Sequence, residues 1–346
     1  MKYKYISDIR LEVSVLSLGS MTFGDQNSIN DSYNQLDLAF DYGVNLIDTA
    51  EMYPIPISPK TQGRTEEYIG RWMKDRGNRK DIILASKVTG PSPRLTHIRK
   101  GATEFNKKDI YNAIDGSLKR LCTDYIDLYQ IHWPERNTNN FGKLGYNVFD
   151  EKYSTTILET LEVLGRLTKD GKVRHIGISN ETPWGLSQYL KLSESHDLPK
   201  PITIQNPYSL LNRSYEIGLS EFSHHENIGL LAYSPLGFGV LTGKYLNGQM
   251  PKDSRRRLFD GYDRYSNIEG ELATEEYIKL AKESGLNPAQ MALAFVYSRP
   301  FVTSAIVGAT TLEQLKHNLD SINLNLSEDV IQAIESIHRM HPNPCP

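Results

Sequence analysis

The sequence has little cysteine and no long apolar run. Its two cysteines, Cys122 and Cys345, have no paired spacing, so we expect neither a disulfide framework nor a zinc site. This scarcity indicates a reducing compartment. No run reaches the roughly 18 apolar residues of a membrane-spanning helix. The N-terminal segment mixes acids with apolar residues, unlike a signal peptide. We therefore expect a soluble, cytoplasmic, globular protein.

Net charge and low-complexity segments are equally scarce. The formal charge of −3 at pH 7 offers no electrostatic case for nucleic acid or an anionic membrane as a partner. The densest basic cluster is the three arginines at 255–257. No Ser/Gly linker or internal repeat divides the 346 residues, a length that suits either two domains or one large barrel with insertions. We expect a single domain over residues 1–346.

Short apolar runs alternate with segments of helical spacing. The runs lie at 15–18, 45–49, 82–87, 126–132, 173–179, 202–205, 229–234 and 304–308. The helical segments lie at 31–42, 65–76, 108–121, 155–169, 183–194, 214–224, 272–284 and 311–320. Strands that alternate with helices predict an α/β fold with a parallel sheet. Eight such units favour a single closed (β/α)8 TIM barrel over an open doubly wound sheet.

Further segments fall outside this alternation. Residues 4–14 predict a β-hairpin ahead of the barrel, whereas 287–299 and 327–338 predict additional helices near the C-terminus. Thr311 and Gln314 have the spacing of a capping box at a helix start. Long connections follow three strand ends and are therefore expected as functional loops on the C-terminal face of the barrel, at 88–107, 133–153 and 235–270.

Polar side chains end three consecutive predicted strands. Asp48, Lys87 and His132 are the last or nearly the last residues of their runs, and Tyr53 follows Asp48 on a short loop. Because neighbouring strands lie about 4.8 Å apart, these side chains can converge above one point. Each has an ordinary explanation: a turn aspartate, a solvated lysine or packed aromatic rings. Their coincidence at one end of the barrel favours a catalytic site.

This set of side chains suits proton transfer to a carbonyl oxygen. A phenol is a proton donor at neutral pH, and a nearby lysine cation lowers its pKa. The aspartate would fix the lysine, and the histidine would hydrogen-bond the substrate oxygen. Together they predict general acid–base catalysis of carbonyl reduction, which still requires a source of hydride.

Motifs along the chain resemble one enzyme family. They are "GSMTFG" (19–24), "NLIDTAEMYP" (45–54), "ASKV" (85–88), "DLYQIHWP" (127–134), "GKVRHIGISN" (171–180) and "AYSPLGFGVLTGKY" (232–245). In this order they resemble the aldo-keto reductase superfamily over nearly the whole chain. "TIQNPYSLLNRS" (203–214) and "GATTLEQLKHNL" (308–319) are most similar to its bacterial Tas-like branch.

The resemblance implies NADP(H)-dependent reduction of a small aldehyde or ketone, with Tyr53 as proton donor and Asp48, Lys87 and His132 as its partners. It implies a cofactor held without a Rossmann fold, and no G-x-G-x-x-G motif opens a strand–helix unit here. Of the implied contacts, Ser179, Asn180 and Gln205 would hold the nicotinamide carboxamide, with Tyr233 stacked on the ring. The full implied cofactor set is Ser20, Met21, Asp48, Ser179, Asn180, Gln205, Tyr233, Ser234, Pro235, Leu236, Gly237, Phe238, Gly239, Val240, Leu241, Lys244, Arg255, Gly308, Thr310, Gln314 and Asn318.

Several alternatives stay open at this stage. The 2′-phosphate of NADPH could be held by Thr311, Gln314 or Lys316, or by the arginines at 255–257. The same fold could serve a slow-turnover, nucleotide-sensing binding protein. A metal-dependent barrel hydrolase is a third possibility, but no H-x-H or H-x-x-x-H pair ends a strand. The predicted substrate loops carry the aromatic residues Trp133, Phe141, Tyr146 and Phe149. Neither the substrate nor the oligomeric state follows from the sequence.

Overall fold

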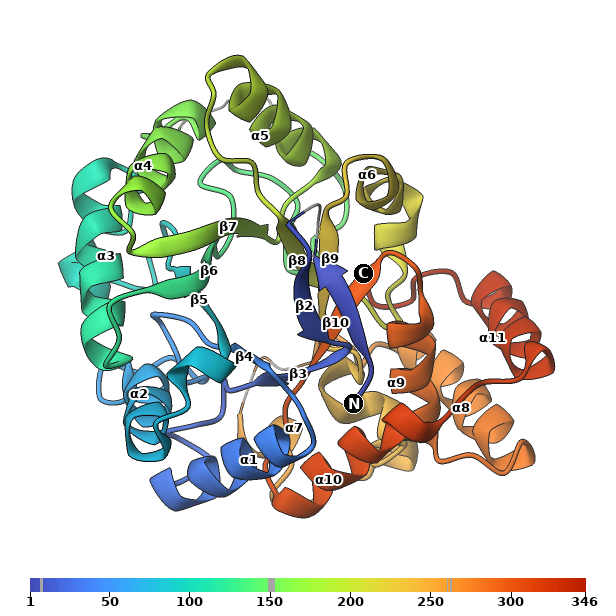
Figure 1. Cartoon of the computed structure of the whole chain (residues 1–346). Coiled ribbons are helices and arrows are strands. Elements are labelled where there is room, and N and C mark those ends of the chain that lie inside the picture. The colour runs from blue at the N-terminus through green and yellow to red at the C-terminus, as the bar shows by residue number, and fades with distance from the viewer. Residues whose placement is uncertain (7–8, 149–152, 260, 262) are drawn as a thin grey trace.

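A closed parallel barrel forms the centre of the protein. The computed structural model describes residues 1–6, 9–148, 153–259, 261 and 263–346. Around the ring the strand order is β10-β3-β4-β5-β6-β7-β8-β9, with helices on the outside (Figure 1). The strands are β3 (Leu16–Gly19), β4 (Leu46–Asp48), β5 (Ile83–Val88), β6 (Ile126–Ile131), β7 (Val173–Ser179), β8 (Thr203–Pro207), β9 (Gly229–Tyr233) and β10 (Val302–Val307). The expected (β/α)8 barrel is confirmed.

The strands are mainly apolar because both of their faces are covered. Every residue of β5 and of β6 is buried. Successive side chains point to opposite faces, so Ala85 and Leu128 join the cluster inside the barrel, whereas Leu84 and Tyr129 pack under the helices. Runs without polar alternation in the sequence therefore correspond to strands between two apolar layers.

Amphipathic helices cover the outside of the ring. In α4, Thr156 and Glu159 form a capping box, and Leu161, Leu164 and Leu167 are buried on one face. The connections from β3 to β9 contain α1 (Ile29–Asp41), α2 (Arg64–Arg76), α3 (Lys107–Arg120), α4 (Ile157–Lys169), α5 (Pro183–Ser195) and α6 (Leu219–His225), and α10 (Leu312–Asp320) follows β10.

The predicted N-terminal hairpin closes the amino end of the barrel. Strands β1 (Tyr3–Ile6) and β2 (Leu11–Ser14) pair antiparallel, and Ile6 and Val13 are fully buried in the cluster inside the barrel. The Lys4 ammonium donates hydrogen bonds to three main-chain oxygens in the segment from Tyr297 to Val302, at 2.6–3.1 Å. Burial lowers the pKa of Lys4 to about 8. In Figure 1 the hairpin lies across the barrel opening.

The C-terminal helices differ in role from the expectation. Helix α9 (Pro288–Ser298) packs directly on β10, and α8 (Ile268–Glu283) packs on α9 and on α11 (Glu328–Met340) (Figure 1). The sequence pattern predicts 272–284 as the barrel helix and 287–299 as the additional one, and this prediction is wrong because the two roles are exchanged. Residues of α9 are buried on nearly all sides, as suits an inner helix, whereas α8 buries one face.

The expected long connections all leave the carboxyl ends of strands, after β5, β6 and β9. The connection after β9 includes 3-10 turns at Gly237–Thr242 and Leu246–Gly248 and the short helix α7 (Arg255–Leu258). Within the part of the chain that the structure describes, no helix is both long and apolar enough to cross a bilayer.

A single domain remains a prediction, and calorimetry tests it. One hydrophobic cluster joins residues from Val15 to Cys345, so the chain is expected to unfold in one heat-absorption peak. Differential scanning calorimetry at two heating rates would measure this. Two heat-absorption peaks, each shifted to a different extent when urea is added, would contradict the single-domain prediction.

Candidate active site

The strand-end residues lie at the carboxyl end of the barrel. Asp48 is the last residue of β4, Lys87 is next to last in β5, and His132 directly follows β6. The strand register places Asp48 beside Ala85 and Lys87 beside Gln130. The structure therefore brings the three predicted side chains to one end of three neighbouring strands.

Lys87 and Asp48 form a buried ion pair. The Lys87 side chain is fully buried, and its Nζ lies 2.7 Å from Oδ2 of Asp48 and 2.8 Å from the main-chain oxygen of Thr49. Burial lowers the pKa of Lys87, and the Asp48 carboxylate opposes this by raising it. Oδ1 of Asp48 accepts a hydrogen bond from Nε2 of Gln205 at 2.8 Å. Both carboxylate oxygens of Asp48 are thus engaged.

Tyr53 lies beside this ion pair. Nζ of Lys87 is 5.1 Å from the centre of the Tyr53 ring, and the His132 ring meets the same ring edge-on at 5.9 Å. The loop is held by main-chain bonds from Tyr53 N to Ala50 O at 3.1 Å and from Gly63 N to Tyr53 O at 2.8 Å. The aspartate, lysine, tyrosine and histidine predicted as a set are therefore neighbours.

His132 is neutral in this environment. Burial lowers its pKa well below the usual value, and the Lys87 cation lowers it further. A neutral imidazole carries one N–H donor and one acceptor nitrogen. Among the described residues, Nδ1 of His132 has no hydrogen-bond partner. The ring can therefore donate a hydrogen bond to an oxygen without carrying charge.

A second set of polar side chains adjoins these four. Nδ2 of Asn180 donates to the main-chain oxygen of His132 at 2.8 Å, and Oδ1 of Asn180 accepts from the Tyr233 hydroxyl at 2.7 Å. The Ser179 hydroxyl donates to the main-chain oxygen of Gln205 at 2.8 Å. Burial raises the pKa of Tyr233. The residues that the resemblance assigns to the nicotinamide thus lie beside His132 and Asp48.

One large cavity opens above both sets. Its volume is about 1030 Å³, at the upper end of the usual 300–1000 Å³ for small-molecule sites. Asp48, Tyr53 and His132 line one part, and residues of the β10–α10 connection line another. Lys87 lies beneath the floor and does not line the cavity.

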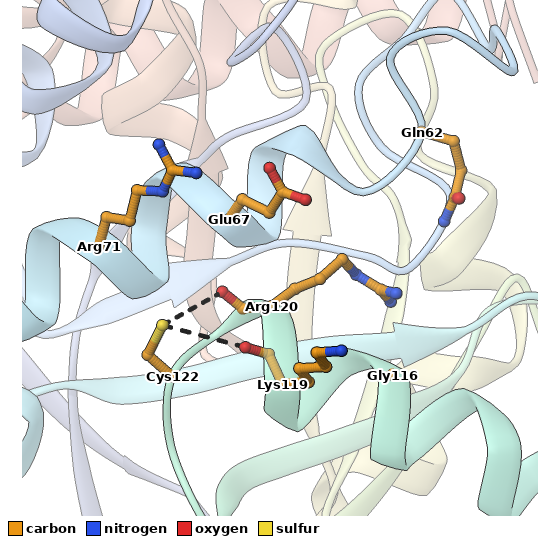
Figure 2. Close-up of a pocket in the computed structure, with 7 residues that line it drawn as sticks. All are labelled: Gln62, Glu67, Arg71, Gly116, Lys119, Arg120 and Cys122. Atoms are coloured by element: carbon orange, nitrogen blue, oxygen red, sulfur yellow. Dashed lines mark hydrogen bonds between the residues drawn. The ribbon is translucent and has the colours of Figure 1, made fainter.

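A second, smaller cavity of about 480 Å³ lies outside the barrel between α2 and α3 (Figure 2). There the Cys122 thiol contacts the main-chain oxygens of Lys119 and Arg120 at 3.9 and 3.8 Å. None of the residues in the predicted tetrad lines this cavity. Nowhere in the described part of the chain are three His, Cys, Asp or Glu side chains grouped to hold a metal. The large cavity is therefore the candidate active site.

Comparison with known proteins agrees with this geometry. A model of the Aldo/keto reductase family matches residues 15–339. The chain belongs to the aldo/keto reductase family. It is 52% identical over 346 residues to Protein tas of Escherichia coli K12, with both chains covered completely, so it is a Tas-like aldo/keto reductase.

More distant relatives include a channel subunit and a reductase. A probable voltage-gated potassium channel subunit beta of Arabidopsis thaliana is 30% identical over 356 residues, covering 99% of this chain and 98% of the relative. The L-glyceraldehyde 3-phosphate reductase of Escherichia coli O157:H7 is 29% identical over 351 residues, covering 97% and 92%. Family and relatives support assignment of the protein as an oxidoreductase.

Most of the expected cofactor contacts of this aldo/keto reductase line the large cavity. Gly237, Val240 and Leu241 do not, and the latter two are buried in the hydrophobic core. Those that line it are Ser20, Met21, Asp48, Ser179, Asn180, Gln205, Tyr233, Ser234, Pro235, Leu236, Phe238, Gly239, Lys244, Arg255, Gly308, Thr310, Gln314 and Asn318.

The loop after β9 has an unusual backbone. Ser234, Gly237, Phe238 and Gly239 have φ between 53° and 88°, the left-handed region. The main-chain N–H groups of Gly237 and Gly239 donate to the oxygens of Ser234 and Leu236, each at 2.9 Å, and close tight turns in this loop. The φ of 88° at Gly239 favours glycine, and a Cβ there would lie 2.9 Å from Nζ of Lys244, which would have to shift.

Helix α10 begins at the far end of the cavity. The Thr311 side chain accepts a hydrogen bond from Gln314 N, as a capping box requires, but Oε1 of Gln314 returns to Thr310 N at 3.1 Å rather than to Thr311. The predicted cap is thus confirmed, with its reciprocal bond displaced by one residue. The positive end of the helix dipole points toward the cavity lining at Thr310 and Thr311.

The structure shows which of the candidate partners of the 2′-phosphate line the cavity. Arg255 lines the cavity, whereas Arg256 lies over the Tyr245 ring at 5.1 Å and does not line it, nor does the exposed Arg257. Lys316 pairs with Asp320 at 3.0 Å and also lies outside the lining. Thr311 and Gln314 do line the cavity.

The cavity is also lined by residues that were not predicted as site residues from the sequence. Gln26 and Ser254 line the cavity, and Oε1 of Gln26 and Oγ of Ser254 are buried with no hydrogen-bond partner in the described regions. Lys252, Asn287 and His317 also line it. His317 belongs to the motif at 308–319. Gln26, Lys252, Ser254 and Asn287 neither follow directly after a strand nor belong to a motif, so only the folded chain identifies those four.

The substrate loops contribute fewer aromatic rings than expected. Trp133 and Phe141 line the cavity, with ring centres 6.1 Å apart. Tyr146 is exposed and does not line it, and Phe149 lies outside the described residues. Met52 and Ile55, which flank Tyr53 in the sequence, line it instead. The walls next to Tyr53 are mainly apolar.

Breaking the buried ion pair is expected to destabilise the barrel. Lys87→Met leaves the Asp48 carboxylate buried without its cation and should lower the free energy of unfolding by about 3–5 kcal/mol. The double variant Asp48→Asn/Lys87→Met removes both charges and should recover most of that loss. Urea denaturation would measure both values.

Lys172→Met is the matched control, because Lys172 pairs with a half-exposed Asp115 and should cost less than about 1 kcal/mol. A Lys87→Met variant as stable as this control would show that the ion pair does not hold the barrel end together.

Proposed function

We propose that the protein reduces an aldehyde or ketone to an alcohol, with NADPH as hydride donor and Tyr53 as proton donor. The observation that carries this proposal is the fully buried Lys87 cation, 5.1 Å from the centre of the Tyr53 ring at the floor of the cavity. The name of one relative, L-glyceraldehyde 3-phosphate reductase, records an aldehyde as substrate and supports the same reaction here.

The proposed proton transfer depends on four side chains. Reduction places negative charge on the carbonyl oxygen, and the Tyr53 hydroxyl donates its proton to that oxygen. The Lys87 cation stabilises the phenolate left behind, and Asp48 keeps Lys87 charged and in place. Neutral His132 donates a hydrogen bond to the same oxygen and fixes its angle. Bound NADPH would supply the hydride to the carbonyl carbon.

The lining of the cavity fits a dinucleotide. Ser179, Asn180 and Gln205 would hold the carboxamide, with the nicotinamide ring on Tyr233. The left-handed loop from Ser234 and the Lys244 ammonium would hold the pyrophosphate, and Gly308, Thr310 and Asn318 would hold the adenosine end. The unpartnered Oε1 of Gln26 and Oγ of Ser254 support a polar ligand, because buried polar atoms normally have partners.

Arg255 is the proposed partner of the 2′-phosphate. Of the three arginines at 255–257, only Arg255 lines the cavity. Lys252, three residues earlier in the sequence, lines it as well. A guanidinium group can bind two phosphate oxygens at once, which favours NADPH over NADH.

A slow-turnover, nucleotide-sensing role is the second candidate. The observation that favours it is the likeness to a probable voltage-gated potassium channel subunit beta. Turnover separates the two functions, because a sensor binds NADPH without reducing a panel of aldehydes. For either function we propose a cytoplasmic location, where the free thiols of Cys122 and Cys345 stay reduced.

Tyr53→Phe tests the proton donor. It removes one hydroxyl oxygen and keeps the ring, so folding and NADPH binding should be unchanged. The rate of aldehyde reduction should fall by about 10² to 10⁴, the usual cost of losing a general acid. Steady-state kinetics with NADPH would measure this, with Tyr146→Phe, outside the cavity, as control. A Tyr53→Phe enzyme that keeps more than about a third of the rate while chemistry is limiting would rule out Tyr53 as the donor.

Arg255→Ala tests the phosphate partner. It should weaken NADPH binding by about 1.5–3 kcal/mol, the range for a charge-assisted hydrogen bond, and leave NADH binding unchanged. Quenching of protein fluorescence during titration with each nucleotide would measure the affinities. Arg256→Ala and Arg257→Ala are matched controls, since neither side chain lines the cavity. Equal affinity of the unmodified protein for both nucleotides would refute the NADPH preference.

A further inference from the structure

Glu51 is a buried carboxylate two residues before Tyr53 that the proposed proton transfer does not use. Its side chain is almost fully buried, and its Oε2 accepts a hydrogen bond from Thr89 N at 3.0 Å. Its main-chain N donates to the oxygen of Lys87 at 3.1 Å, and its main-chain oxygen accepts from Gln62 at 2.7 Å. Glu51 therefore ties the Tyr53 loop to the exit of β5, the strand that carries Lys87.

Arg99 comes to Glu51 from the long connection after β5. Its guanidinium forms an ion pair with Oε2 of Glu51 and also donates to the main-chain oxygens of Thr89 at 3.1 Å and Ala102 at 2.8 Å. Arg99 has φ of 45°, a left-handed conformation that is unfavourable for any residue but glycine. These contacts hold Arg99 there, and the main-chain N–H and oxygen of Thr89 are engaged, one by each member of the pair.

Apolar contacts join the same two loops. Leu95 and Ile98 pack with Ala50 and Met52 in a small cluster, and Tyr53, Ile55 and Trp133 pack against it. Met52, Tyr53, Ile55 and Trp133 line the cavity next to His132. A shift of the connection after β5 would therefore be transmitted both to the wall of the cavity and to the loop that carries Tyr53.

We propose that Glu51 and Arg99 are positioning residues, which hold the Tyr53 phenol over Lys87 by clamping the Tyr53 loop to the exit of β5. This inference rests on the proposed role of Tyr53 as proton donor. A reacting group displaced by about 1 Å can lose about 100-fold in rate, so a clamp two residues away affects the chemistry without touching the substrate.

The double variant Glu51→Gln/Arg99→Met is the main test. Arg99→Met alone would leave Glu51 buried and unpaired and could prevent folding, whereas the double variant removes both charges. For 4-nitrobenzaldehyde reduction with NADPH, kcat per folded molecule should fall by about tenfold to 100-fold. NADPH affinity should stay unchanged. Arg99→Lys, which keeps the charge but not the fork of donors, should retain more activity than the double variant.

The NMR signal of Tyr53 tests the same inference without a turnover measurement. In protein labelled with carbon-13 tyrosine, the Tyr53 signal is the one missing from Tyr53→Phe. It should move in the double variant, because the distance from the Lys87 cation to the ring changes. Glu216→Gln/Arg213→Met/Glu335→Gln is the matched control: it removes another buried arginine together with both of its glutamate partners, and none of the three residues lines the cavity. This control should leave both the Tyr53 signal and kcat unchanged.

Two results would overturn the inference: an unmoved Tyr53 signal with unchanged kcat, or a loss of kcat that the control reproduces to the same extent. If the unmodified protein reduces no aldehyde at all, the proposed function fails instead. The Tyr53 signal of the double variant then decides alone whether the pair positions the phenol.

Discussion

Two opposite charges, Lys87 and Asp48, form an ion pair at the floor of the cavity, where neither has more than slight contact with water. Such a pair is tolerable only when each charge finds its partners in the protein. Strands β4 and β5 supply the pair, and Gln205 reaches Asp48 from β8. The floor of the candidate site therefore depends on the closed ring of strands, which brings residues distant in sequence to one ion pair.

The four residues at this floor were predictable because the barrel topology determines where the ends of the strands lie. Asp48, Lys87 and His132 end consecutive apolar runs, and a parallel barrel places the carboxyl ends of consecutive strands side by side. The eight strands were predictable for a related reason. Strands buried on both faces leave mainly apolar segments in the sequence, and here these segments alternate with segments of helical spacing.

Features that depend on tertiary contacts could not be predicted in the same way. Arg255, Arg256 and Arg257 are equivalent in sequence, and only the course of the loop after β9 turns Arg255 alone of the three to the cavity. Gln26 and Ser254 adjoin no strand end, so their unpartnered oxygens carry no local pattern. The exchange of roles between α8 and α9 follows from packing against β10. The unbroken apolar run at 291–297 is nevertheless typical of a helix buried on all sides and could have identified α9 as the inner helix.

The N-terminal hairpin makes the barrel one-sided. With Ile6 and Val13 filling the amino end, the described residues leave the large cavity at the carboxyl end as the approach to Tyr53. Substrate and nucleotide must then arrive and depart on the same side, and the connections after β5, β6 and β9 surround that route. Changes in these loops can therefore alter how fast substrate and nucleotide bind and leave. The packing of the hairpin at the amino end is unaffected by such changes.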